Sequence, residues 1–163
     1  MPQTVTCQDI DGTEHTVDVS SLCWRPSAYA VIVKDGCVLA IPAFGGYSLP
    51  GGALELGESI STALEREVAE ETGLTVRVTR QLGFESNFFI LPGISHKGNN
   101  IQSILLFCAA EYAGGELIAE EFAEDQKDFG GMPEWLPIVG LPGIRPAGAD
   151  WRKYVEGYEN TRD

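Results

Sequence analysis

Residues Gly52 to Leu74 read GALELGESISTALEREVAEETGL, and this stretch decides how the rest of the chain is interpreted. It places Glu67, Glu70 and Glu71 within little more than one turn of a predicted helix, where residues three and four apart share a face. Carboxylates that converge in this way repel one another unless protons or a cation neutralise them. Oxygen ligands at this density suit Mg²⁺ or Mn²⁺.

The helical phase of this stretch turns its acids toward the protein body. At about 100° per residue, one apolar arc contains Ile60, Ala63, Leu64 and Val68. The opposite side carries Thr62, Glu65, Ala69 and Thr72. Glu67 and Glu71 fall inside the apolar arc and Glu70 at its edge, where an unpaired charge is costly. This favours metal binding, and the alternative is a solvated acidic helix in which Arg66 and Glu70 form an i, i+4 ion pair.

The same residues resemble the signature of the Nudix hydrolases, G-x5-E-x7-R-E-U-x-E-E-x-G-U, in which U is aliphatic. Every fixed position is matched, by Gly52, Glu58, Arg66, Glu67, Val68, Glu70, Glu71, Gly73 and Leu74. The preceding Leu49-Pro50-Gly51 also looks like the usual lead-in of that family. The resemblance implies an α/β fold, an α/β/α sandwich with a mixed β-sheet, in which the signature forms a loop–helix–loop motif.

The remaining segments are consistent with a single domain over residues 1–163, the default at this length. Residues 1–24 are predicted to form an N-terminal β-hairpin extension, with strands Thr4–Ile10 and Thr13–Val19 around Asp11-Gly12. A second hairpin is predicted from Tyr29–Val33 and Val38–Ile41 around Asp35-Gly36. Asp-Gly between such runs indicates a type I′ turn.

Two helices and several further strands complete the prediction. The first helix extends from about Ser59 to Thr72, with Ser59 or Ser61 as N-cap and Gly73 at its C-terminal end. Strand-like runs lie within Val76–Ile90, Ile101–Tyr112 and Glu134–Ile138, with a loop at Leu91–Asn100. The last helix, about Asp150–Tyr158, carries a core-facing stripe of Trp151, Tyr154, Val155 and Tyr158. Mixed strands and two separated helices favour a sheet covered on both faces.

The charge of the chain limits its partners. The net charge is −13 and the pI about 4.4, so binding to a nucleic-acid polymer is not expected. A small phosphorylated substrate requires metal ions to screen the site. No apolar run has the length of a membrane span and the N-terminus has no signal-peptide pattern, so we expect a cytoplasmic monomer or homodimer without membrane contact. The four cysteines have no C-x-x-C spacing and are expected to be reduced and packed.

The resemblance implies hydrolysis of a phosphoanhydride bond in a nucleoside diphosphate linked to another group, with Mg²⁺ or Mn²⁺ as cofactor. The positions that match the family's metal-binding acids are Glu67, Glu70 and Glu71. Glu58 matches the first acid of the motif, which often helps to bind metal or supports the helix. Arg66 matches an arginine that orients a neighbouring carboxylate, and Gly51 matches a position whose carbonyl can coordinate metal.

The general base and the base-stacking residues stay open at this point. The base is either a glutamate of the motif or a loop residue, and the loop candidates are Glu120, Glu121, Glu124 and His96. Each of these is more often a solvated surface residue. Phe88, Phe89 and Trp135 are candidates for stacking on a nucleobase, although large aromatic residues more often belong to the core.

The substrate also stays open. Markers of coenzyme A, NADH and dinucleoside-polyphosphate enzymes are absent, and Pro92 does not fit the register of the ADP-ribose enzymes. A nucleoside triphosphate and an NDP-sugar-type substrate are therefore equally weighted. The alternative to a hydrolase is a non-catalytic Nudix regulator that binds a nucleotide or a sugar. Such domains usually have a degraded signature, so the intact one favours catalysis.

Overall fold

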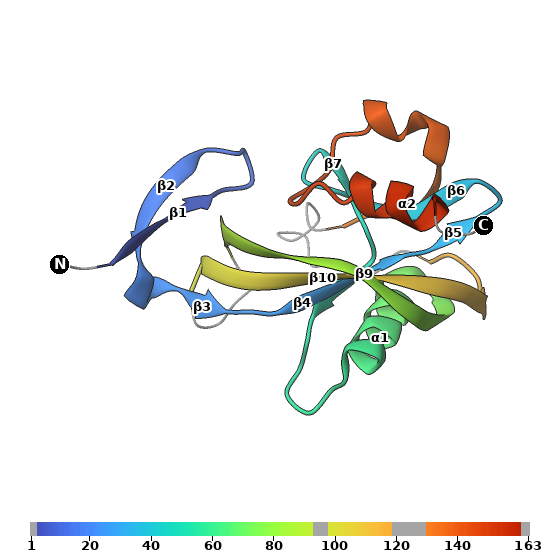
Figure 1. The fold of residues 1–163 in the computed structure, drawn as a ribbon, viewed down its shortest axis with the longest axis horizontal. Helices are drawn as coiled ribbons and strands as arrows, with labels where there is room; N and C mark the ends of the chain where they lie inside the picture. Colours follow the sequence, from blue (N-terminus) through green and yellow to red (C-terminus); the bar gives the residue numbers. More distant parts are fainter. Residues whose placement is uncertain (1–2, 93–97, 119–129, 161–163) are drawn as a thin grey trace.

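The computed structural model describes residues 3–92, 98–118 and 130–160. Its centre is a curled, mixed β-sheet with one helix on each face (Figure 1). Helix α1 (Ile60–Thr72) lies on one face and helix α2 (Arg152–Glu159) on the other. The predicted α/β class, the mixed sheet and the two covering helices are confirmed.

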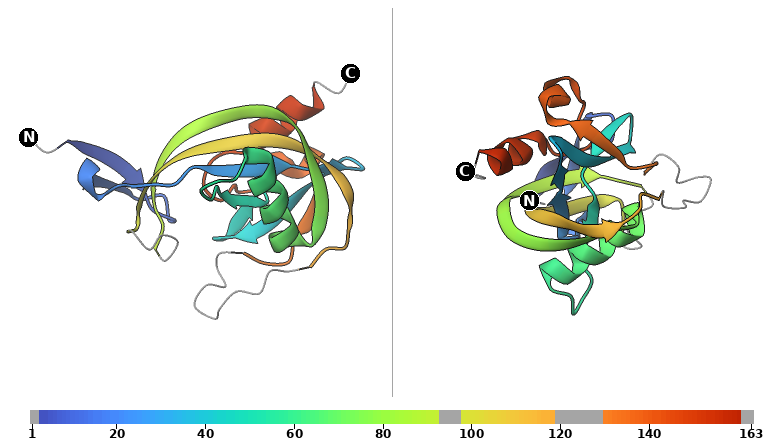
Figure 2. Two further views of the ribbon diagram at one scale, coloured as in Figure 1. Left: turned by 90° about the horizontal axis from the view of Figure 1, so that it is seen from below. Right: turned by 90° about the vertical axis from the view of Figure 1, so that its right-hand side faces the viewer.

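The larger sheet has seven strands in the order β2-β1-β9-β10-β4-β8, and β3 pairs with β10. The bounds of these strands are β1 Thr4–Gln8, β2 Glu14–Asp18, β3 Cys23–Trp24, β4 Ser27–Val31, β8 Gly51–Ala53, β9 Leu74–Ile90 and β10 Asn100–Gly115. β10 runs parallel to β4 and β3, and β9 runs parallel to β1, whereas the other neighbours are antiparallel. Figure 2 shows how β9 and β10 curl together along the molecule.

The smaller sheet has four strands, ordered β11-β6-β5 with β7 paired to β6. Their bounds are β5 Val33–Lys34, β6 Cys37–Ala43, β7 Gly46–Ser48 and β11 Glu134–Pro137. Two short 3₁₀ helices, η1 Val19–Ser21 and η3 Ile138–Gly143, lie in the connections. No helix within the described ranges is long and apolar enough to cross a membrane.

The core divides into two clusters because successive residues of a strand point to opposite faces of its sheet. The cluster at α1 contains Ala28, Ala30, Ile32, Leu39, Leu64, Val68, Leu74, Val76, Cys108 and Ala110. The cluster at α2 contains Val31, Val38, Ala40, Leu49, Leu105, Phe107, Leu136, Leu141, Trp151 and Val155. The predicted stripe of the last helix therefore packs into the core, and Trp151 and Val155 are its buried anchors. All four cysteines are free, and three of them are buried.

The two predicted hairpins form, but their turns differ. At the second, Asp35 and Gly36 have φ of 51° and 73° between the paired Lys34 and Cys37, as a type I′ turn requires. The predicted strand Tyr29–Val33 is split, because Ile32 leaves the large sheet and its carbonyl accepts a hydrogen bond from Leu39 of β6.

The prediction of a type I′ turn at Asp11-Gly12 is wrong. The last pair of the hairpin is Gln8 with Glu14, so five residues form the connection. The Asp9 carboxylate accepts hydrogen bonds from the amides of Asp11 at 3.0 Å and Thr13 at 2.9 Å. An aspartate side chain that bonds to nearby backbone amides in this way replaces the tight turn.

Helix α1 begins and ends as the sequence predicts. The Ser59 hydroxyl accepts a hydrogen bond from the Thr62 amide at 3.1 Å, and Gly73, with φ of 73°, ends the helix. The phase prediction was wrong for two residues, because Ile60 is 39% exposed and Thr72 is fully buried. Thr72 is satisfied in the core because its hydroxyl donates to the Val68 carbonyl at 2.6 Å.

Candidate functional site

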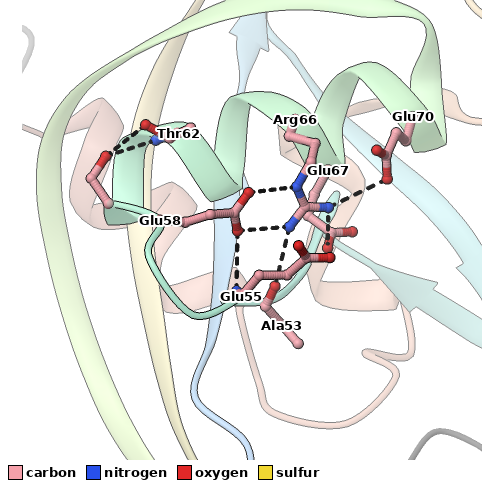
Figure 3. Close-up of polar contacts among 8 residues, drawn as sticks. Ala53, Glu55, Glu58, Thr62, Arg66, Glu67 and Glu70 are labelled. Atoms are coloured by element: carbon pink, nitrogen blue, oxygen red, sulfur yellow. Dashed lines mark hydrogen bonds and ion pairs between the residues drawn. The ribbon is translucent and has the colours of Figure 1, made fainter.

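Arg66 of α1 holds three acids of the motif together (Figure 3). Its Nε and Nη2 donate to the two carboxylate oxygens of Glu58 at 2.8 and 3.0 Å. Its Nη1 donates to Glu67 at 2.9 Å and lies 3.4 Å from Glu70. The paired guanidinium lowers the pKa of Glu58 to about 2. Glu58 therefore acts with Arg66 as a clamp that joins the glycine-rich loop to the helix.

Glu67 lies against the loop backbone. A β-carbon added to Gly52 would lie only 2.6 to 2.9 Å from the carboxyl atoms of Glu67, so this close approach requires glycine. The Glu67 side chain is 19% exposed. Burial raises its pKa, although the hydrogen bond from Arg66 partly opposes that shift. Glu67 is thus a half-buried acid whose charge Arg66 only partly compensates.

Glu71 reaches the same loop one helical turn later. The Gly51 amide donates to Glu71 Oε2 at 2.7 Å. In the ladder between β4 and β8, the Ala30 amide donates to the Pro50 carbonyl and the Leu54 amide donates to the Pro26 carbonyl. Gly51 is opposite Tyr29, and this pattern makes the two residues a non-hydrogen-bonded pair of the ladder. Its amide and its carbonyl consequently point away from β4, on the side of Glu71.

A pocket of about 490 Å³ opens beside this loop. Of the predicted site residues, Gly51, Glu67, Glu71 and Phe89 line it. Glu58 and Glu70 do not, because the Arg66 clamp holds Glu58 and because Glu70 projects toward solvent with 57% of its side chain exposed. The motif helix therefore contributes two carboxylates to the pocket wall.

The three candidate aromatic residues separate in space. Phe89 lines the pocket, and Phe88, the preceding residue of β9, belongs to the other face of the sheet. Trp135 packs against the core cluster at α1. The structure thus places only Phe89 of these three beside the acids.

The donor atoms around Gly51 and Gly52 match the chemistry of a divalent cation. Two carboxylates and one outward-facing carbonyl are the oxygen ligands that Mg²⁺ and Mn²⁺ prefer. Within the ranges that the structure describes, however, no three His, Cys, Asp or Glu side chains are arranged as a metal-binding group. Arg66 contacts Glu58, Glu67 and Glu70 and neutralises part of their charge. Glu67, Glu71 and the Gly51 carbonyl therefore have the ligand chemistry that a divalent cation requires. Glu70, the third acid of the motif, points toward solvent instead.

Sequence reasoning missed most of the pocket wall. Residues 8–12 of the N-terminal hairpin and residues 145–149 both line it, as do Arg25, Tyr29 and Asn87. None of these belongs to the Gly52–Leu74 motif, and they come together only because the N-terminal hairpin, β4, β9 and the segment before α2 meet around the loop. Burial raises the pKa of Tyr29, which keeps its hydroxyl neutral. The loop-base candidates Glu120, Glu121, Glu124 and His96 lie outside the described residues.

Comparison with known proteins identifies the family. The family model of the NUDIX domain matches residues 24–155. The chain belongs to the Nudix family. The resemblance seen in residues 52–74 therefore extends over most of the chain, and the match begins just after the N-terminal hairpin.

Several curated Nudix relatives are similar to this chain. The ADP-ribose pyrophosphatase of Methanocaldococcus jannaschii is 35% identical over 104 residues, which cover 61% of this chain and 57% of that protein. The NAD-capped RNA hydrolase NudC of Vibrio atlanticus is 31% identical over 73% of this chain and 37% of its own length. The chain thus spans between about a third and three fifths of these relatives.

Solved structures show the same Nudix fold. The mutator MutT protein of Bacillus halodurans has a TM-score of 0.61 and 25% identity, and covers 80% of this chain and 79% of its own. A Nudix hydrolase of Nitrosomonas europaea has a TM-score of 0.64 at 19% identity, covering 85% and 90%. The second likeness, at this identity, shows the fold alone.

Proposed function

We propose that this Nudix protein is a divalent-metal-dependent pyrophosphohydrolase that cleaves a phosphoanhydride bond in a nucleoside diphosphate linked to another group. The observation that supports this most is the placement of Glu67 and Glu71 against the Gly51–Gly52 backbone at the wall of a 490 Å³ pocket. The names of the relatives, which include a pyrophosphatase and a hydrolase of NAD-capped RNA, support the same reaction type.

The acids of the motif have separate roles in this proposal. Glu67, Glu71 and the Gly51 carbonyl would hold Mg²⁺ or Mn²⁺ through their oxygen atoms. Glu70 would join them by leaving its 3.4 Å contact with Arg66, and that contact contributes little because the Glu70 side chain is exposed. Glu58 keeps Arg66 in place, and Arg66 in turn orients Glu67.

The pocket residues provide the remaining chemistry. A divalent cation supplies neutralisation of the phosphate charge and a water of lowered pKa. A carboxylate of this site would accept the proton of the attacking water, which is the role of a general base. Phosphoryl transfer of this kind depends mainly on positioning and on charge stabilisation. Phe89 and the neutral Tyr29 line the volume in which the nucleoside would lie.

A hydrolysis screen tests the proposal. The protein is incubated with nucleoside triphosphates, NDP-sugars, ADP-ribose and NAD, each with Mg²⁺, Mn²⁺ or EDTA, and the phosphate-containing products are identified. We expect turnover of at least one compound with either cation and none with EDTA. Binding of nucleotides without hydrolysis of any of them would instead indicate a regulatory Nudix domain.

Variants then assign the acids. Glu67→Gln and Glu71→Gln keep the shape of each side chain and remove its charge, so kcat is expected to fall by roughly 100-fold or more. Glu65→Gln is the matched control, because Glu65 lies on the same helix and accepts a hydrogen bond from the Val78 amide outside the pocket. Near-normal turnover by both site variants would refute the assignment.

A further inference from the structure

Two arginines of this acidic chain differ from its other described cations. Arg66, Arg77, Arg152 and Lys153 form ion pairs with acids. Lys34 lies over the ring of Tyr112, and Arg80 over the ring of Tyr158. Among residues 3–92, 98–118 and 130–160, this leaves Arg25 and Arg145 with neither an ion pair nor an aromatic partner. Both line the pocket that contains Glu67 and Glu71.

Arg25 lines the pocket and is anchored through one of its donors. It is partly buried, and its Nη1 donates to the hydroxyl of the fully buried Ser27 at 3.0 Å. A guanidinium has five N–H donors, so the others remain for an acceptor in the pocket. Its charge acts on both Glu67 and Tyr29, which places it in the electrostatic neighbourhood of the acids.

Arg145 lies on a different wall. Its Nη1 lies beside Gly45 of the β6–β7 turn, and its carbonyl accepts a hydrogen bond from the Tyr47 amide at 2.9 Å. The backbone is therefore fixed to β7, while the exposed side chain can extend into the pocket. The loop of the N-terminal hairpin forms a further part of the pocket wall that carries charge. Its Asp9 carboxylate already accepts hydrogen bonds from the amides of Asp11 and Thr13, and it contacts His15 at 2.7 Å.

We propose that Arg25 and Arg145 bind two successive phosphates of the substrate, with Arg25 on the phosphate next to Glu67 and Glu71 and Arg145 on the other. This inference rests on the proposed function and specifies how the same site recognises a diphosphate. Arginine suits the task because its planar fork matches phosphate oxygens and stays charged. In a chain of net charge −13, these two arginines are the cationic groups of a pocket that Asp9, Asp11, Glu67 and Glu71 also line, so they provide the local attraction that an anionic ligand needs.

The experiment measures binding without requiring turnover. ADP, AMP and adenosine are titrated calorimetrically into the full chain in the presence of Mg²⁺. We expect wild type to bind ADP more tightly than AMP, and AMP more tightly than adenosine. Arg25→Gln should weaken ADP binding by roughly 10- to 100-fold, because a charge-assisted hydrogen bond is lost. Arg145→Gln should weaken ADP binding less, since this side chain is exposed, and should bring ADP and AMP close together.

Matched variants separate a local effect from net charge and from misfolding. Arg77→Gln removes the same charge from a pair with Glu111 outside the pocket and should leave ADP binding within about twofold. Arg25→Lys keeps the charge without the fork and should recover part of the affinity. Melting curves of each variant identify any that fail to fold.

The outcomes distinguish this inference from the proposed function. Arginine-dependent ADP binding in a protein that hydrolyses nothing would support the phosphate site and refute the hydrolase. Hydrolysis accompanied by ADP binding that neither Arg25→Gln nor Arg145→Gln weakens beyond the Arg77→Gln control would overturn the phosphate site alone. The same conclusion follows if wild type binds ADP no better than adenosine.

Discussion

At the scale of single residues, the geometry of the site depends on how closely Glu67 approaches Gly52. The carboxyl atoms of Glu67 occupy the space that a β-carbon at position 52 would need. Gly51 is equally constrained, because its φ is 145° and a β-carbon there would lie 2.1 Å from the Ala28 carbonyl oxygen. Gly52 thus allows β8 to approach Glu67 of α1, and Gly51 allows it to approach the backbone of β4.

We therefore predict that Gly52→Ala displaces the Glu67 carboxylate. A displacement of about 1 Å at a reacting centre costs on the order of 100-fold in rate, whereas stability should change little, because the atoms that must move are the end of a flexible side chain. Steady-state kinetics and urea unfolding measure the two effects. Gly140→Ala is the control, because no atom lies within 4 Å of its added β-carbon. Unchanged kinetics in Gly52→Ala would show that Glu67 is not required at this position.

At the scale of elements, the loop and helix of the motif are joined by the Glu58–Arg66 pair. The pKa of Glu58 is lowered from 4.5 to about 2, first by its hydrogen bonds to Arg66. A lowered folded-state pKa stabilises the protein above the unfolded pKa, and this contribution is lost as the pH falls toward the folded value. The melting temperature of wild type should thus fall more steeply between pH 4.5 and 2 than that of Glu58→Gln. Parallel melting curves for the two proteins would contradict a stabilising pair.

The start of α1 offers a second test at this scale. The Ser59 hydroxyl caps the helix through the Thr62 amide, so Ser59→Ala should lower the free energy of unfolding by about 1 kcal/mol. Ser61 is exposed and lies within the helix, where alanine has the higher propensity. Ser61→Ala should therefore leave stability unchanged or raise it slightly. Urea unfolding of both variants checks the cap, and equal losses would argue against it.

At the scale of the whole molecule, metal binding should stabilise the fold. A ligand that binds only the folded state adds RT ln(1 + [L]/Kd) to stability, which is roughly 1–2 kcal/mol for millimolar Mg²⁺ and a sub-millimolar Kd. We expect a rise of several degrees in melting temperature in wild type and a smaller one in Glu67→Gln. NaCl at matched ionic strength is the control, since screening of exposed charges is not ligation. Equal shifts with both salts in both proteins would indicate a solvated acidic surface.

The sequence alone was sufficient for the local features. Alternating and helical hydrophobic patterns predicted both hairpins and both helices, and Ser59 and Gly73 marked the ends of α1, because these signals act between residues near one another in the chain. It failed at Asp11-Gly12, where the Asp9 side chain replaces the tight turn. The helical phase also placed Thr72 on the exposed side, which is wrong. Its hydroxyl donates to the Val68 carbonyl of the preceding turn, so the side chain can be buried.

Tertiary structure decided which acids of the motif share a wall and what surrounds them. The spacing of Glu67, Glu70 and Glu71 is the same on an isolated helix, and only the approach of β8 distinguishes the two that meet the loop from the one that faces solvent. Arg25 and Arg145 are 120 positions apart and belong to no motif. They line one pocket because the fold brings the connection between β3 and β4 and the segment before α2 to the same side of the loop. Local spacing therefore determined which acids the motif presents, while long-range packing determined the pocket that two of them line.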